Sequence, residues 1–149
     1  MIALDTNLLI YADTPGDPYH RNAAAFALIE KLTVRAACIP LQVLSEFLNV
    51  CRHKKMLDFD LAAERVHAYA QVFATPPTAL HDLAEANRLS KHYNLQYFDA
   101  LILAVSARAG ATMLLSEDMQ DGLEIGGLRI VNPFLAANDG LISDYFANS

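Results

Sequence analysis

Residues 2–12 read Ile2-Ala3-Leu4-Asp5-Thr6-Asn7-Leu8-Leu9-Ile10-Tyr11-Ala12, and this stretch indicates the fold. Its first three residues form a short apolar run of strand length, which ends at a carboxylate. Thr6 and Asn7 suit the start of a helix, and the apolar residues after them continue as a short buried helix. A strand that leads directly into a helix is typical of parallel α/β proteins.

The same alternation continues along the chain. Further short strands are expected at residues 36–39, 112–115 and 128–131, the last after a turn at Gly126-Gly127. Helical periodicity predicts helices at residues 20–32, 40–51, 61–73, 81–92 and 98–109. Pro40 fits the first helical position of the second of these, and Asp58 or Asp60 fits the cap of the third. Breaker residues occupy 13–18 and 75–77. The pattern predicts a parallel sheet with helices on both faces.

Length and composition limit the class of protein. The 149 residues are expected to form a single domain, 1–149. With 54% hydrophobic and 19% charged residues, the chain is neither disordered nor fibrous. Its net charge of −6 argues against nucleic-acid binding by bulk charge alone, but allows a nuclease that uses a metal and a local basic patch.

The sequence favours a cytoplasmic protein that has no contact with membranes. Cys38 and Cys51 lack a CxxC spacing and are expected to be reduced, buried thiols. The first residues lack the basic region of a signal peptide, and no apolar run approaches the ~18 residues of a membrane helix.

Four acidic residues are expected near the carboxyl ends of the strands, where parallel α/β sheets bind their ligands. Asp5 ends the first strand, and Asp118 follows the strand at 112–115. Asp99 opens a helix, and Glu46 is the only charged residue between Pro40 and Cys51. A buried carboxylate is costly unless it is paired or bound to a metal, so this constellation predicts a cation site.

Each acid also has a structural interpretation. Asp5 and Asp99 suit helix caps, and Asp118 suits a turn. Glu46 suits a solvated stripe, because Gln42 and Asn49 lie on the same helix face. Two further acids near Asp118 are expected to lie outside the site: Glu117 is read as solvated, and Asp121 suits a turn before Gly122.

A basic cluster, Arg52-His53-Lys54-Lys55, has two interpretations as well. It is either a solvated helix end that suits the helix dipole, or a patch that contacts RNA phosphates, joined by Arg21 and Arg88. The histidines have no zinc-ligand spacing, and the phosphate-loop, dinucleotide and serine-hydrolase motifs are absent from the sequence.

The acidic motifs carry a family resemblance. Leu4-Asp5-Thr6-Asn7, Ser45-Glu46, Phe98-Asp99-Ala100 and Leu115-Ser116-Glu117-Asp118 resemble, in order and spacing, the four acidic motifs of PIN-domain ribonucleases, in particular the VapC-type toxins of bacterial toxin–antitoxin pairs. Residues 118–122 and 128–134 are similar to the C-terminal part of that family, so the resemblance covers nearly the whole chain.

The resemblance implies a PIN-like fold, with a short parallel β-sheet of four or five strands sandwiched by helices. It implies an endoribonuclease that depends on Mg²⁺ or Mn²⁺ and hydrolyses RNA phosphodiesters. Asp5, Glu46, Asp99 and Asp118 would bind the metal, and Thr6, Asn7 and Ser116 would orient them, with Asp121 as a possible extra acid. Arg52, Lys54 and Lys55 are candidates for RNA contact. A small antitoxin protein and a second copy of the chain, forming a homodimer, are the expected partners.

Three other functions stay open. One is a PIN nuclease that is not a toxin, and another is a PIN-like binding module without activity, although none of the four acids is missing. The third is a metal-dependent phosphohydrolase with an aspartate nucleophile. That mechanism requires a second Asp two residues after the first, where this chain has Asn7.

Overall fold

The computed structural model describes residues 1–16 and 21–147. In chain order the elements are β1 (Ile2–Leu4), α1 (Thr6–Asp13), α2 (Arg21–Leu32), β2 (Ala37–Cys38), α3 (Leu41–Lys54), α4 (Phe59–Val72), α5 (Leu80–Tyr93), α6 (Tyr97–Arg108), β3 (Met113–Leu115), β4 (Glu124–Ile125), β5 (Leu128–Val131), a 3₁₀ turn (Ala136–Asn138) and α7 (Asp139–Ala147). The expected helix start at His20 and the end of the loop expected at 13–18 lie outside the described residues.

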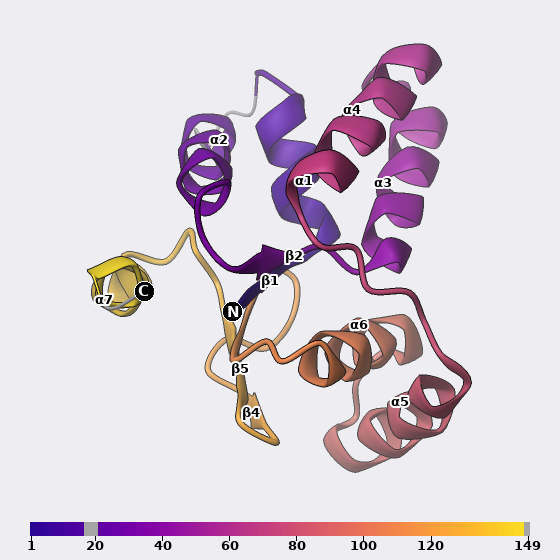
Figure 1. The fold of residues 1–149 in the computed structure, drawn as a ribbon, viewed down its shortest axis with the longest axis vertical. Helices are drawn as coiled ribbons and strands as arrows, with labels where there is room; N and C mark the ends of the chain where they lie inside the picture. Colours follow the sequence, from indigo (N-terminus) through magenta and orange to yellow (C-terminus); the bar gives the residue numbers. More distant parts are fainter. Residues whose placement is uncertain (17–20, 148–149) are drawn as a thin grey trace.

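The five strands form one sheet in the order β2-β1-β3-β5-β4. The first four strands in this order are parallel, with Leu4 beside Leu115 and Leu115 beside Val131. Figure 1 shows the helices in three groups around these strands: α1 to α4 together, α5 beside α6, and α7 apart from the others. This arrangement confirms the predicted α/β fold.

Apolar burial explains why the central strands form. All three residues of β1 and of β3 are buried, as continuous apolar runs in parallel strands should be. Helix α6 packs against the same core, with every residue from Ala100 to Ser106 buried. The core therefore fixes the ends of β1 and β3 and the first turn of α6, which carry three of the four expected acids.

The structure differs from the sequence prediction at the C-terminal end. Glu124–Ile125 forms an additional strand, β4, which pairs antiparallel with β5 across the Gly126-Gly127 turn. Both glycines have positive φ angles, of 59° and 87°, which this turn requires. Residues 139–147 form helix α7, which the sequence analysis did not predict. In the described part of the chain, no helix has both the length and the apolar character needed to cross a membrane.

Candidate metal-dependent active site

The register of β1 and β3 brings the first and fourth acidic motifs together. Leu4 pairs with Leu115, and the Asp5 backbone N–H donates to the Leu115 carbonyl at 3.1 Å. Asp5 follows β1 and Ser116 follows β3, so the two residues are neighbours. The Ser116 hydroxyl donates to Asp5 Oδ2 at 2.6 Å. Both side chains are buried.

The two carboxylate oxygens of Asp5 accept three hydrogen bonds. It is the N-cap of α1, and its Oδ1 accepts from the Thr6 backbone N–H at 2.7 Å. Its Oδ2 takes the bond from Ser116 and a second bond from Asn7 Nδ2 at 3.3 Å. The capping interpretation of Asp5 is thus confirmed, but it uses only one of the two carboxylate oxygens.

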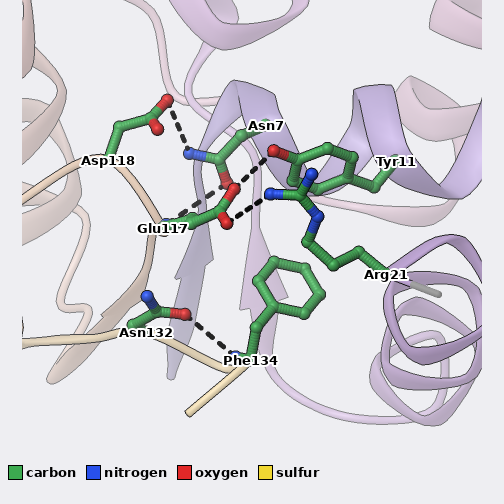
Figure 2. Close-up of polar contacts among 7 residues, drawn as sticks. All are labelled: Asn7, Tyr11, Arg21, Glu117, Asp118, Asn132 and Phe134. Atoms are coloured by element: carbon green, nitrogen blue, oxygen red, sulfur yellow. Dashed lines mark hydrogen bonds and ion pairs between the residues drawn. The ribbon is translucent and has the colours of Figure 1, made fainter. Parts of the chain in front are cut away.

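Asn7 connects the two strand ends. Its Nδ2 donates to Asp118 Oδ2 at 3.3 Å as well as to Asp5, and its Oδ1 accepts from the Glu117 backbone N–H at 3.4 Å. Figure 2 shows Asn7 between Asp118 and Glu117. The side chain of Asn7 therefore fixes the loop after β3 relative to the start of α1.

Glu46 enters from helix α3. Its Oε2 accepts from the Thr6 hydroxyl at 3.0 Å, and its Oε1 accepts from Gln42 Nε2 at 2.6 Å. Glu46 is half-buried and hydrogen-bonded to α1, whereas Asn49 on the same face of α3 is exposed, as the interpretation of a solvated stripe expects.

Asp99 lies in the first turn of α6 but does not cap it. The N-cap residue is Gln96, and no side chain makes the capping bond. Burial raises the pKa of Asp99, and the charges of Glu46 and Asp118 raise it further. The negative charges of Glu46 and Asp118 therefore act on the Asp99 carboxylate.

Burial raises the pKa of Asp5 to about 6. The bonds from Ser116 and Thr6 act in the opposite direction, and the charges of Asp99 and Glu46 add to the increase. In the described part of the chain, none of the four acids makes a salt bridge. A group of acids without a salt-bridge partner, in which Asp5 and Asp99 have raised pKa values, is suited to a cation.

A cleft of about 330 Å³ collects most of these groups. Asp5, Glu46 and Asp118 line it together with Thr6, Asn7 and Lys54. Within residues 1–16 and 21–147, however, no three His, Cys, Asp or Glu side chains lie close enough together to hold one metal ion. The donors, all carboxylate oxygens, have the chemistry that Mg²⁺ and Mn²⁺ prefer, but an ion would have to draw them together.

Glu117 lies beside the cleft. The sequence predicts that it is solvated, but its carboxylate is hydrogen-bonded. It accepts from the Tyr11 hydroxyl and from Arg21 Nη1, the latter at 2.5 Å (Figure 2). The Arg21 guanidinium also lies 4.3 Å from the centre of the Tyr11 ring, and Tyr11 packs edge-on against Phe134. This contact joins residues about one hundred positions apart, so no local sequence signal could reveal it.

The remaining candidates occupy different places. Asp121 Oδ1 accepts from the Asn132 backbone N–H at 2.7 Å and from Asn138 Nδ2 at 2.9 Å, so it joins two loops outside the cleft. Arg88 pairs with Glu85 on the exposed surface of α5. Of the basic cluster, whose members are all exposed, Lys54 lines the cleft.

Comparison with protein families decides the classification. The model of the PIN domain matches residues 2–120, which contain all four acidic motifs. The chain belongs to the PIN domain family. None of the curated proteins compared with this PIN domain matches its sequence significantly.

Solved structures share the fold of this PIN domain. A toxin–antitoxin complex from Klebsiella pneumoniae matches with a TM-score of 0.65 and 20% identity, over 89% of this chain and 98% of that one. Mycobacterium tuberculosis VapC20, a toxin that cleaves the sarcin–ricin loop, matches with a TM-score of 0.64 and 18% identity, over 79% and 90%. FitAcB from Neisseria gonorrhoeae matches with a TM-score of 0.63 and 16% identity, over 90% and 99%.

Proposed function

We propose that this PIN-domain protein is a metal-dependent endoribonuclease and the toxin of a VapBC-type toxin–antitoxin pair. The observation that carries the proposal is the cleft in which Asp5, Glu46 and Asp118 converge without a cationic partner in the described part of the chain. The toxins among the structures with the same fold support the second half of the proposal.

Asp5, Glu46, Asp99 and Asp118 would hold Mg²⁺ or Mn²⁺. A bound divalent ion supplies two kinds of chemistry: it lowers the pKa of a bound water, and it offsets the negative charge that grows on the phosphate. The protein contributes by fixing the ligands in advance: Thr6 holds Glu46, Ser116 holds Asp5, and Asn7 holds Asp5 and Asp118. Such hydrogen bonds to metal ligands keep the carboxylates oriented.

The RNA strand would pass over the cleft beside the end of α3. Lys54 lines the cleft, and Arg52 and Lys55, which are close to it in the sequence, are exposed. Their positive charges would offset the repulsion between the phosphates and a protein of net charge −6.

The protein would act in the cytoplasm as a homodimer that binds a small antitoxin. An arginine from an antitoxin arm, placed over the same acidic cleft, would neutralise the acids in place of a metal ion. The toxin–antitoxin assembly among the structures with this fold supports this choice of partner. Light scattering at micromolar concentration tests the dimer, and a strict monomer would exclude it.

Asp99→Asn tests the metal site, because it removes one charge and keeps the side-chain shape. We expect it to abolish RNA cleavage in Mn²⁺. Mn²⁺ at about 100 times its dissociation constant should stabilise the wild type by about 2.7 kcal/mol and the variant by much less. The assay is a cleavage gel on mixed RNA, with melting curves in EDTA and in Mn²⁺.

Asp60→Asn is the matched control, because Asp60 is an exposed acid in the first turn of α4, outside the cleft. It should cut RNA and respond to Mn²⁺ as the wild type does. Normal cleavage by Asp99→Asn, with an undiminished Mn²⁺ shift, would refute the four-carboxylate site. Hydrolysis of a phosphate monoester in place of RNA would indicate the phosphohydrolase, and RNA binding without cleavage would indicate a binding module.

A further inference from the structure

Gln42 lies in the first turn of α3 and links two of the acidic motifs. Its side-chain Nε2 donates to Glu46 Oε1 at 2.6 Å and to the backbone carbonyl oxygen of Phe98 at 3.2 Å. Phe98 is the residue directly before Asp99. A single amide group therefore joins the Glu46 carboxylate to the turn of α6 that carries Asp99.

The two oxygens of Glu46 are held by different elements. Gln42 holds Oε1, and the Thr6 hydroxyl of α1 holds Oε2 at 3.0 Å. Removal of Gln42 would leave Glu46 with one of these two donors and would break the link to α6. The direction of the carboxylate would then be less restricted.

The other end of the Gln42 amide is unsatisfied. Its Oε1 is buried and has no hydrogen-bond partner among the described residues. A reversed amide would not solve this, because its oxygen would then face two acceptors, the Glu46 carboxylate and the Phe98 carbonyl. The two bonds of Nε2 thus fix an orientation that leaves a buried acceptor unpaired. Unpaired buried acceptors are unfavourable and require an explanation.

We propose that Gln42 is a positioning residue of the metal site, which holds Glu46 in the direction that metal binding needs and at a fixed place relative to Asp99. The inference deepens the proposed function and rests on it. The competing explanation is an ordinary contact between residues four apart on a helix. Such a contact would affect the stability of α3 and leave metal affinity unchanged.

Gln42→Met separates the two explanations, because Met has a similar length, favours helices and carries no hydrogen-bonding group that can replace the amide. Isothermal titration of the metal-free protein with Mn²⁺ gives the dissociation constant, and single-turnover cleavage of RNA gives the activity. We expect Gln42→Met to weaken Mn²⁺ binding about 10- to 100-fold. Gln42→Ala, measured in parallel, should show the same loss and covers the case in which Met does not fit.

Asn49→Ala is the matched control. Asn49 lies on the same face of α3, three residues beyond Glu46, and is exposed. Its substitution should leave Mn²⁺ affinity and cleavage unchanged. Glu46→Gln provides a second test, since Gln42→Met should have little further effect on Mn²⁺ affinity in that background if it acts through Glu46.

The outcomes separate this inference from the proposed function. Wild-type Mn²⁺ affinity in both Gln42 variants would overturn the positioning role, while cleavage by the wild type would keep the nuclease. An equal loss of affinity in the wild-type and Glu46→Gln backgrounds would also overturn it, because Gln42 would then not act through Glu46. A wild-type protein that neither binds Mn²⁺ nor cuts RNA would overturn both.

Discussion

Replacement of Asp5 by Asn should stabilise the metal-free protein at neutral pH. Asp5 is only 6% exposed, and burial raises its pKa from 3.8 to about 6. The carboxyl group therefore binds a proton more tightly in the folded protein than in the unfolded chain. Between pH 3.8 and 6 the folded state carries more protons, so the free energy of unfolding falls as pH rises through this window.

The size of the effect follows from the shift. With a pKa difference of about two units, the Asp5 carboxyl group lowers the free energy of unfolding by about 3 kcal/mol at pH 7.5 and by about 1 kcal/mol at pH 4.5. The Asp5→Asn variant would keep the capping bond, because the oxygen of the new amide can accept from the Thr6 N–H, and the Ser116 hydroxyl can turn to accept from the amide nitrogen. The bond from Asn7 would be lost, at about 1 kcal/mol. We expect a net gain of about 2 kcal/mol at pH 7.5 and about none at pH 4.5.

Urea unfolding in EDTA at the two pH values measures this difference. If the proposed metal site is correct, Mn²⁺ should reverse the order of stability at pH 7.5, since the wild type would gain from metal binding and Asp5→Asn would lack a ligand. Asp60→Asn, at an exposed site, should unfold as the wild type does at both pH values. The reasoning is refuted if Asp5→Asn is less stable than the wild type at pH 7.5 in EDTA, or if the difference between them does not change with pH.

Three further predictions test other parts of the molecule. Replacing both Lys54 and Lys55 by Ala should weaken RNA binding for all sequences alike and flatten its salt dependence, measured by fluorescence anisotropy; an unchanged slope would make the cluster a solvated helix end. Arg108→Met should destabilise the fold by about 2 kcal/mol in urea titrations, because the buried Asp82 carboxylate loses the guanidinium that holds it at 2.8 Å and keeps, among the described residues, only the Ala79 N–H and His81. Asp121→Ala should lower stability by about 1 kcal/mol and leave Mn²⁺ affinity unchanged; a loss of affinity would make Asp121 a ligand.

The fold could be predicted from the sequence wherever burial is strong. Apolar runs such as Ile2–Leu4 and Met113–Leu115 are buried at every position, so their composition alone marks them as central parallel strands. Helix α7 has no fully buried residue, and its apolar side chains are only partly covered. Strand β4 has two residues and forms through its pairing with β5. Strand β4 is too short to show a periodic pattern, whereas α7 carries apolar residues at helical spacing, Leu141, Ile142, Tyr145 and Phe146, which the sequence analysis did not use.

The convergence of the acidic motifs could be predicted for a geometric reason. Carboxyl ends of neighbouring parallel strands meet at one edge of a sheet, so residues that follow β1 and β3 must lie side by side. The contacts of Glu117 with Tyr11 and Arg21 could not be predicted, because only the folded chain brings these positions together.

Asp5 shows why sequence patterns could not decide between a helix cap and a metal ligand. Both roles require a short carboxylate at the junction of a strand and a helix, so the two interpretations predict the same residue at the same place. The structure separates them by atom: Oδ1 accepts the capping bond from Thr6, and Oδ2 faces Ser116 and Asn7, which also holds Asp118. The cap fixes the carboxylate and thereby turns its second oxygen toward Ser116 and Asn7. At this position the helix cap therefore orients the carboxylate for the proposed metal binding, and Asp5 can serve as cap and as ligand at the same time.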